Sequence, residues 1–194
     1  MKWTHGGVVA STAAMLFALA APAHADVING GFETGTLAGW TATGDTGFSG
    51  VDAFAARSGI YGAFFGPTDP GGISQSFATI ASTAYRVSFS LSLTDATPPT
   101  SFSWSWNGVT QAPSFNNGAA FGYTDFSSLV TATGATATIA FNFRDPAAFW
   151  LLDNVSVTAV TAVPEMPVNA LMGAGLLLLA ASAKRRAKRR KNAA

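Results

Sequence analysis

The 194-residue chain contains no cysteine, which excludes disulfide bonds and thiol chemistry. It has only two histidines, His5 and His24, and both lie within the first 25 residues. Lysine occurs at position 2 and then only within residues 184–191, so the body of the chain lacks the amine that Schiff-base chemistry needs. Without His, Cys or Lys, this body cannot build a Ser-His-Asp triad or a His/Cys zinc site.

Positive charge is also scarce in the body. Residues 26–161 hold nine acids against three arginines, a net charge of −6. Proteins that bind nucleic acid cluster Lys and Arg on their folded surface, so this balance argues against a nucleic-acid partner. The cations gather instead near the C-terminus: Lys184, Arg185, Arg186, Lys188, Arg189, Arg190 and Lys191.

Because the body lacks His, Cys and Lys, a pair of carboxylates is the kind of catalytic site that its residues could still form. Glycoside hydrolysis needs two such groups at a separation of about 5–9.5 Å. Most acids of the body stand beside Gly, Thr, Pro or Asn, where aspartate commonly caps turns, and nothing in the sequence shows two of them facing each other. We therefore predict that the protein is not an enzyme, with a glycoside hydrolase as the less favoured alternative.

The N-terminus has the three-part order of a signal peptide. Lys2 supplies a positive charge, residues 8–21 are almost wholly apolar, and Ala23 and Ala25 form the small-x-small site that signal peptidase cleaves. We expect cleavage after Ala25 and export across the inner membrane, with residues 1–25 removed.

The C-terminal segment, residues 162–194, has a second ordered pattern. A short motif at residues 163–167 precedes an apolar run at residues 168–183, and the basic block at residues 184–191 follows. Sixteen residues span about 24 Å as a helix, against ~30 Å for the hydrocarbon core, and the basic end would stay on the cytoplasmic side. Such a short span suits a transient membrane state. The residues of the motif are Val163, Pro164, Glu165, Met166 and Pro167.

The segment "VPEMP…ALMGAGLLLLAASAKRRAKRR" resembles a PEP-CTERM sorting segment, a type also labelled ice-binding protein C-terminal domain. The resemblance implies an exosortase-type membrane enzyme as a partner that acts near the motif. In this chain Met166 stands where the second proline of the motif usually lies, and Pro167 follows one place later. Two outcomes stay open: release at the envelope or surface, or stable anchoring in the inner membrane.

The body itself, residues 26–161, has the alternation of β-strands. Residues 85–93, "YRVSFSLSL", place apolar side chains on one face and Arg or Ser on the other. Residues 135–143 and 149–157 have the same pattern, and no helical period lies between such runs. We predict an all-β fold, an antiparallel jelly-roll β-sandwich, in a single domain.

Three stretches of the body resemble galactose-binding-like jelly rolls, which include families of carbohydrate-binding modules. They are "VINGGFETGTLAGWTATG" from residue 27, "ARSGIYGAFFG" from residue 56 and "FWLLDNVSV" from residue 149. The resemblance implies a structural Ca²⁺ held by Glu33 and Asp153, with carbonyls of residues 29–31 completing its shell of six to eight oxygens. The alternative is two solvated turn carboxylates. From their size and apolar character alone, Phe32 and Trp40 are expected in the core.

The stretch "SFSWSWNG" at residues 101–108 places Phe102, Trp104 and Trp106 on one strand face. These rings either stack against sugar rings or form the inner face of the sandwich before an Asn-Gly turn. Phe149 and Trp150 point to opposite faces, and we expect Trp150 to be the exposed one of the pair and a further candidate for glycan binding beside Trp104 and Trp106.

Two functions remain from the sequence, besides the hydrolase. The first is a non-enzymatic envelope or extracellular-matrix protein that is sorted through its C-terminal segment. The alternative is a carbohydrate-binding module that attaches to extracellular polysaccharide.

Overall fold

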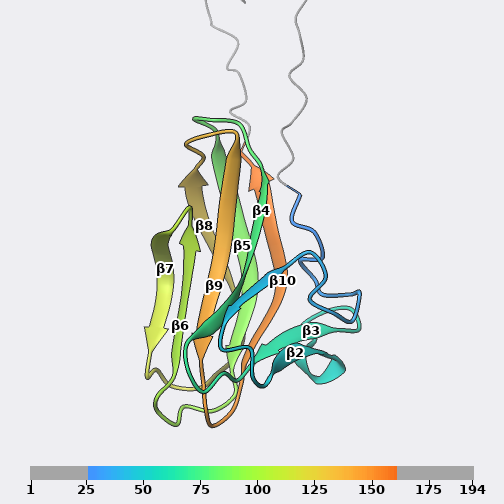
Figure 1. Cartoon of the computed structure of the whole chain (residues 1–194), viewed down its shortest axis with the longest axis vertical. Coiled ribbons are helices and arrows are strands. Elements are labelled where there is room, and N and C mark those ends of the chain that lie inside the picture. The colour runs from blue at the N-terminus through green and yellow to red at the C-terminus, as the bar shows by residue number, and fades with distance from the viewer. Residues whose placement is uncertain (1–25, 161–194) are drawn as a thin grey trace, which may run out of the picture. The chain divides into compact units, whose positions relative to one another are not determined.

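The computed structural model describes residues 26–160 (Figure 1). The predicted signal peptide with Ala23 and Ala25, the sorting motif, the apolar run and the basic block all lie outside the described residues. The elements are β1 (Thr41–Gly44), β2 (Ser49–Asp52), the 3₁₀ turn η1 (Ala53–Ala55), β3 (Gly62–Phe65), β4 (Gly71–Ala78), β5 (Ala84–Leu93), β6 (Ser101–Trp106), β7 (Val109–Asn116), β8 (Phe121–Thr131), β9 (Thr136–Arg144) and β10 (Trp150–Ala159).

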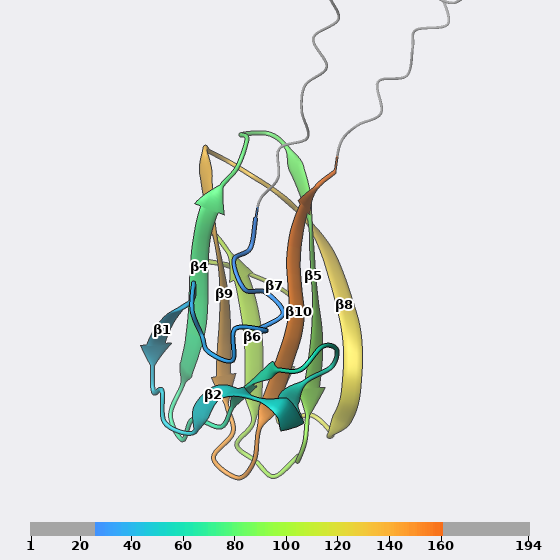
Figure 2. The same ribbon diagram turned by 90° about the vertical axis from the view of Figure 1, so that its right-hand side faces the viewer.

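The strands form two five-stranded sheets that pack face to face (Figure 2). Sheet A has the order β1-β4-β9-β6-β7, sheet B has the order β2-β3-β10-β5-β8, and every pair is antiparallel. The prediction of an all-β sandwich is confirmed. Within residues 26–160, no helix has the length and apolar character that crossing a membrane requires.

Alternation along β5 explains how sheet B presents its two faces. Tyr85, Val87 and Phe89 are buried against the core, whereas Arg86 between them is exposed on the outer face. Ser90 and Ser92 continue the outer row, yet they are only 3% and 5% exposed. Another part of the chain must therefore cover this end of the outer face.

Aromatic rings fill the space between the sheets. Phe65 of β3 stacks on Phe143 of β9 with ring centroids 4.1 Å apart, and Phe32 stacks on Trp40 at 5.9 Å. Both Phe32 and Trp40 are buried, so the expectation that they belong to the core is confirmed. Such offset and tilted ring pairs add to the free energy gained by burying apolar area.

The three tryptophans considered for glycan binding also lie in this core. Trp104 and Trp150 are 0% exposed and Trp106 is 4% exposed. Their indole nitrogens donate to backbone carbonyls, such as that of Ala112 for Trp104. A buried ring has no face to offer a sugar, so the inner-face interpretation holds and the choice of Trp150 as the exposed partner of Phe149 is wrong.

Candidate functional site

The segment after β2 covers the outer face of sheet B, where η1 lies beside β3 and β10 (Figure 2). The Tyr123 hydroxyl of β8 donates a hydrogen bond to the Ala55 carbonyl and so ties η1 to the sheet. Gly62 of β3 allows η1 to lie this close to the sheet, because a Cβ at position 62 would lie 1.9 Å from the Ala55 oxygen. At this end of the outer face the Ser90 hydroxyl donates to Asp125 and accepts from Asn154 Nδ2, and the Ser92 hydroxyl donates to the Phe121 carbonyl.

Two carboxylates, those of Glu33 and Asp153, accept backbone N–H groups of the loop that follows η1; this set of hydrogen bonds is here called the clasp. Asp153 Oδ2 accepts the backbone N–H groups of Arg57 and Ser58 at 2.8 and 3.1 Å. Glu33 accepts the backbone N–H groups of the next turn of the loop, that of Ile60 at 2.9 Å among them. Between these contacts the loop passes through Gly59, at φ +70°, where a Cβ would lie 2.2 Å from Glu33 Oε1.

The clasp brings together the two residues that the sequence proposed as calcium ligands. Burial raises the pKa of Asp153, and the charge of Glu33 adds to the rise. A Cβ on Gly31 would lie 3.8 Å from Glu33 Cγ and 3.9 Å from Asp153 Oδ1, so the two side chains lie close together. Of the carbonyls that would complete a shell, that of Asn29 already accepts two hydrogen bonds and that of Gly30 accepts one. No cluster of three or more His, Cys, Asp or Glu occurs among residues 26–160. The calcium site stays a prediction, while the loop clasp is an observed role of the same carboxylates.

Three phenylalanines form an aromatic cluster on the covered face of sheet B, here called the phenylalanine trio: Phe54, Phe64 and Phe149. Their ring centroids lie 5.2 to 5.9 Å apart, and Phe64 and Phe149 meet edge to face at 5.4 Å. Phe64 points outward because its neighbour Phe65 points into the core. Phe54 is 56% exposed, so the trio offers an apolar ring to solvent.

Four polar side chains lie on the same outer face and are here called the polar network: Arg57, Ser90, Tyr123 and Asp125. The Asp125 carboxylate accepts the Ser90 hydroxyl at 2.6 Å and lies 3.7 Å from the Arg57 guanidinium, which also stands over the Tyr123 ring. Burial raises the pKa of Tyr123 and the Asp153 charge adds to the rise, so the phenol stays protonated as a donor to Ala55. Asp125 and Arg57 keep 69% and 45% of their side-chain surface exposed, which leaves acceptors and donors free for a ligand.

An open hollow of about 410 Å³ adjoins the trio where β5 ends and β8 begins. Ser92, Thr94 and Gly122 are among the residues that line it. The backbone N–H and the hydroxyl of Thr94 both donate to the Phe149 carbonyl, and the same hydroxyl accepts the Phe149 N–H. Thr94 therefore connects the hollow to the trio.

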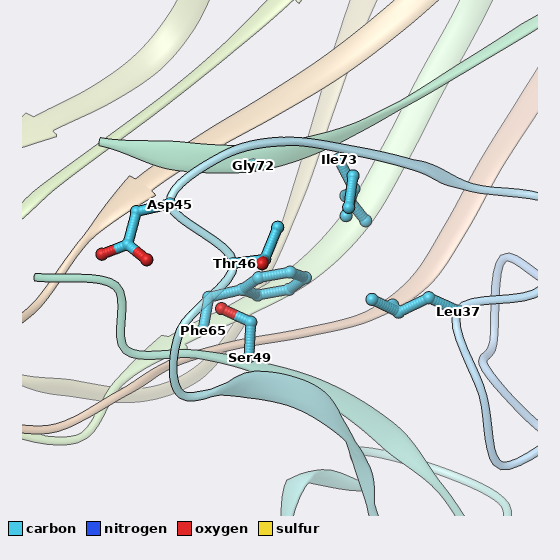
Figure 3. Close-up of a pocket in the computed structure, with 8 residues that line it drawn as sticks. Leu37, Asp45, Thr46, Ser49, Phe65, Gly72 and Ile73 are labelled. Atoms are coloured by element: carbon cyan, nitrogen blue, oxygen red, sulfur yellow. The ribbon is translucent and has the colours of Figure 1, made fainter. Parts of the chain in front are cut away.

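A second hollow, between the two sheets, is too small for a small-molecule ligand. Leu37, Phe65 and Ile73 give it apolar walls, with Asp45, Thr46 and Ser49 at its rim (Figure 3). Its volume is about 30 Å³, the space of one water molecule.

A third hollow of about 330 Å³ lies beside the β6–β7 turn and the end of β8, lined by Asn107, Val109 and Leu129 among others. The outer face of sheet B differs from it in joining an exposed aromatic cluster to the polar network, and this combination makes it the candidate binding site.

The acids described by the structure have evident structural tasks. Asp45, Asp52 and Asp95 accept backbone N–H groups of their own turns, and Asp145 does the same for Ala147 and Ala148. The carboxylates of Asp69 and Asp125 pair with arginines. The turn-capping roles match the sequence-based interpretation that most acids of the body cap turns.

No protein-family model matches the chain, and no curated protein matches it either.

Solved structures with the same fold do exist. A CBM22-1 xylan-binding domain from Paenibacillus barcinonensis is 24% identical, with a TM-score of 0.52 over 74% of this chain and 100% of that one. The CBM22-1-CBM22-2 tandem domain of the same organism is 26% identical, with a TM-score of 0.53 over 77% of this chain and 49% of the tandem chain. A family 16 carbohydrate-binding module is 16% identical, with a TM-score of 0.51 over 68% of this chain and 98% of that one. The fold of residues 26–160 is thus the β-sandwich of carbohydrate-binding modules.

Proposed function

We propose that the body of this chain is a non-catalytic carbohydrate-binding module that binds a polysaccharide on the outer face of sheet B. The observation that carries the proposal is the exposed ring of Phe54, held in the trio beside the polar network. Apolar C–H faces of a sugar suit an aromatic plane, and its hydroxyl groups suit the donors and acceptors of Arg57 and Asp125. The structures that share the fold support this assignment through their names, which describe binding of xylan and other carbohydrates.

The ligand of this surface is an uncharged polysaccharide. The body carries a net charge of −6, which disfavours a polyanionic chain such as a polyuronate. Arg57, the cation of the polar network, is already paired with Asp125. Hydrogen bonding and ring stacking, rather than charge attraction, would therefore dominate recognition.

The test compares Phe54→Ala with a matched control in the full chain. Ile80 is an exposed apolar residue of nearly equal exposure, 54% against 56%, and lies in the β4–β5 turn at the opposite end of the sandwich (Figure 1). Affinity electrophoresis in gels that contain xylan, β-glucan, galactan or a polyuronate reports binding as retardation. We expect retardation by at least one neutral polysaccharide, lost in Phe54→Ala and kept in Ile80→Ala.

Two results would contradict the proposal. The unsubstituted protein could migrate freely in every gel, or Phe54→Ala could be retarded as strongly as Ile80→Ala. The first result removes carbohydrate binding altogether, and the second moves it to another surface.

We also propose, from the sequence of the two ends, that the module is exported and sorted by an exosortase-type enzyme. The support is the ordered pattern of residues 1–25 and 162–194. The intact mass of protein from envelope and medium tests this. A species that begins at Asp26 and ends near Pro164 is the expected result, whereas one that retains residues 184–194 would make the protein a membrane-anchored display of the module.

A further inference from the structure

Phe48 is the most exposed large apolar residue among residues 26–160, at 72%. Its backbone has φ +53°, the left-handed region, which is a costly conformation for a bulky side chain. Two unfavourable features thus coincide at one residue: an aromatic ring in water and a strained backbone.

The loop around Phe48 is braced in this strained form. Asp45 accepts the backbone N–H groups of Gly47 and Asp69 at 2.8 and 3.0 Å and the Thr68 hydroxyl at 3.0 Å. These hydrogen bonds hold the pKa of Asp45 at about 2, well below its ordinary value. The braced loop fixes the backbone from which the ring projects, so less backbone entropy is lost when the ring contacts a ligand.

The same loop joins the phenylalanine trio. The Phe48 carbonyl accepts the N–H of Gly66 at 2.9 Å, and Gly66 lies directly against the Phe149 ring, where a Cβ would meet Phe149 Cδ1 at 2.8 Å. Phe48 precedes β2 and Phe54 follows it, so the two exposed phenylalanines bracket one short edge strand.

We propose that Phe48 is an additional ligand-contacting ring, which extends the glycan surface past the trio and for which the strained loop is retained. The proposal rests on the proposed carbohydrate binding of sheet B. Residues in sparsely populated backbone conformations cluster at ligand sites, where the surrounding structure holds them in place. An exposed ring on a rigid turn next to an aromatic cluster is such a case.

The experiment measures affinity and stability together for Phe48→Gly. Glycine accepts φ +53° without strain, so the thermal midpoint should not fall below that of the wild type. Affinity for the neutral polysaccharide that retards the wild type should weaken by about tenfold, the scale expected for a central aromatic contact. Ser82→Gly is the matched control, because Ser82 has φ +61° in the β4–β5 turn at the other end of the sandwich.

A second variant, Phe48→Leu, keeps an apolar side chain and the strained backbone but removes the ring, and it should also lose affinity. Wild-type affinity in both Phe48 variants would overturn the inference and leave the proposed function standing. A wild type that binds no polysaccharide would overturn both. Loss of affinity in Ser82→Gly as well would show that relief of strain, not the ring, changes binding.

Discussion

Asp153 Oδ2 lies 2.8 Å from the backbone nitrogen of Arg57, a residue 96 positions earlier in the chain. This hydrogen bond joins the last strand of sheet B to the loop that carries the polar network. Glu33 holds the other end of the same loop through Ile60. The position of the loop that carries Arg57 therefore depends on two carboxylates from distant parts of the chain.

Asp153→Asn should lower the free energy of unfolding by about 2 kcal/mol. Asp153 Oδ2 accepts the N–H groups of Arg57 and Ser58 and Oδ1 accepts that of Asn154, so in the variant the amide NH2 must face an N–H donor on one side. Chemical denaturation measures the change. The loss is expected in the presence of a chelator as well as in Ca²⁺. If Ca²⁺ in addition raises the wild-type midpoint but not that of the variant, the predicted calcium site is present; a variant as stable as the wild type would contradict the clasp.

Trp104→Phe separates core packing from binding. Trp104 is fully buried and loses volume and its hydrogen bond to the Ala112 carbonyl in this variant, so we expect a loss of about 1–3 kcal/mol in unfolding free energy. Affinity for polysaccharide should stay unchanged in the folded protein. Phe54→Ala should instead weaken affinity and leave stability nearly unchanged. A Trp104→Phe variant with normal stability and weakened affinity would support the alternative that Trp104 stacks against the sugar.

The lowered pKa of Asp45 predicts that the protein loses stability in acid. Its backbone hydrogen bonds to Asp69 and Gly47 lower its folded pKa to about 2, below the unfolded value of 3.8. The stabilisation is therefore fully present above about pH 4 and is lost as the pH falls toward 2. Thermal melts of wild type and Asp45→Asn between pH 2 and pH 7 should converge at the acid end, and a constant difference across this range would contradict the assignment.

The raised pKa of Asp145 predicts the opposite trend, a loss of stability as the pH rises. Burial raises its folded pKa above the unfolded value, and its Oδ2 is a buried oxygen without a hydrogen-bond partner. Its ionisation costs stability as the pH rises from about 3.8 through the folded pKa. Asp145→Asn should raise the thermal midpoint at pH 7 more than at pH 3.5. Equal midpoints of the variant and the wild type at both pH values would contradict this account.

Polysaccharide binding should depend little on ionic strength. The proposed ligand is neutral and Arg57 is already paired, so screening by salt removes little of the binding free energy. Titrations at about 20 and 500 mM NaCl should give affinities within about twofold of each other. A steep loss with salt would indicate an anionic ligand instead.

The strands were predictable because the burial of one sheet face imposes a period of two. Residues 85–93 were expected as a strand and coincide with β5 within one residue at its start. The Asn-Gly turn after "SFSWSW" was equally predictable, since Asn107 and Gly108 both have positive φ as a tight hairpin requires.

The candidate binding surface was not predictable in the same way. Alternation says that Phe149 and Trp150 point to opposite faces, but it does not say which face meets the second sheet. The structure places Trp150 inside and leaves Phe149 on the outer face with Phe54 and Phe64. No signal in the sequence joined these three rings, because they come from three separate segments.

The sequence by itself determined the composition limits and the strand pattern, since these depend on residue type and on spacing along the chain, and on the same grounds it predicts the two terminal signals. The tertiary structure decided which rings are core and which face outward, and it gave Glu33 and Asp153 their hold on the loop at residues 57–61. The physical reason is distance along the chain. Burial of a face follows from local periodicity, whereas a surface assembled from residues up to 96 positions apart exists only once the sheets have packed.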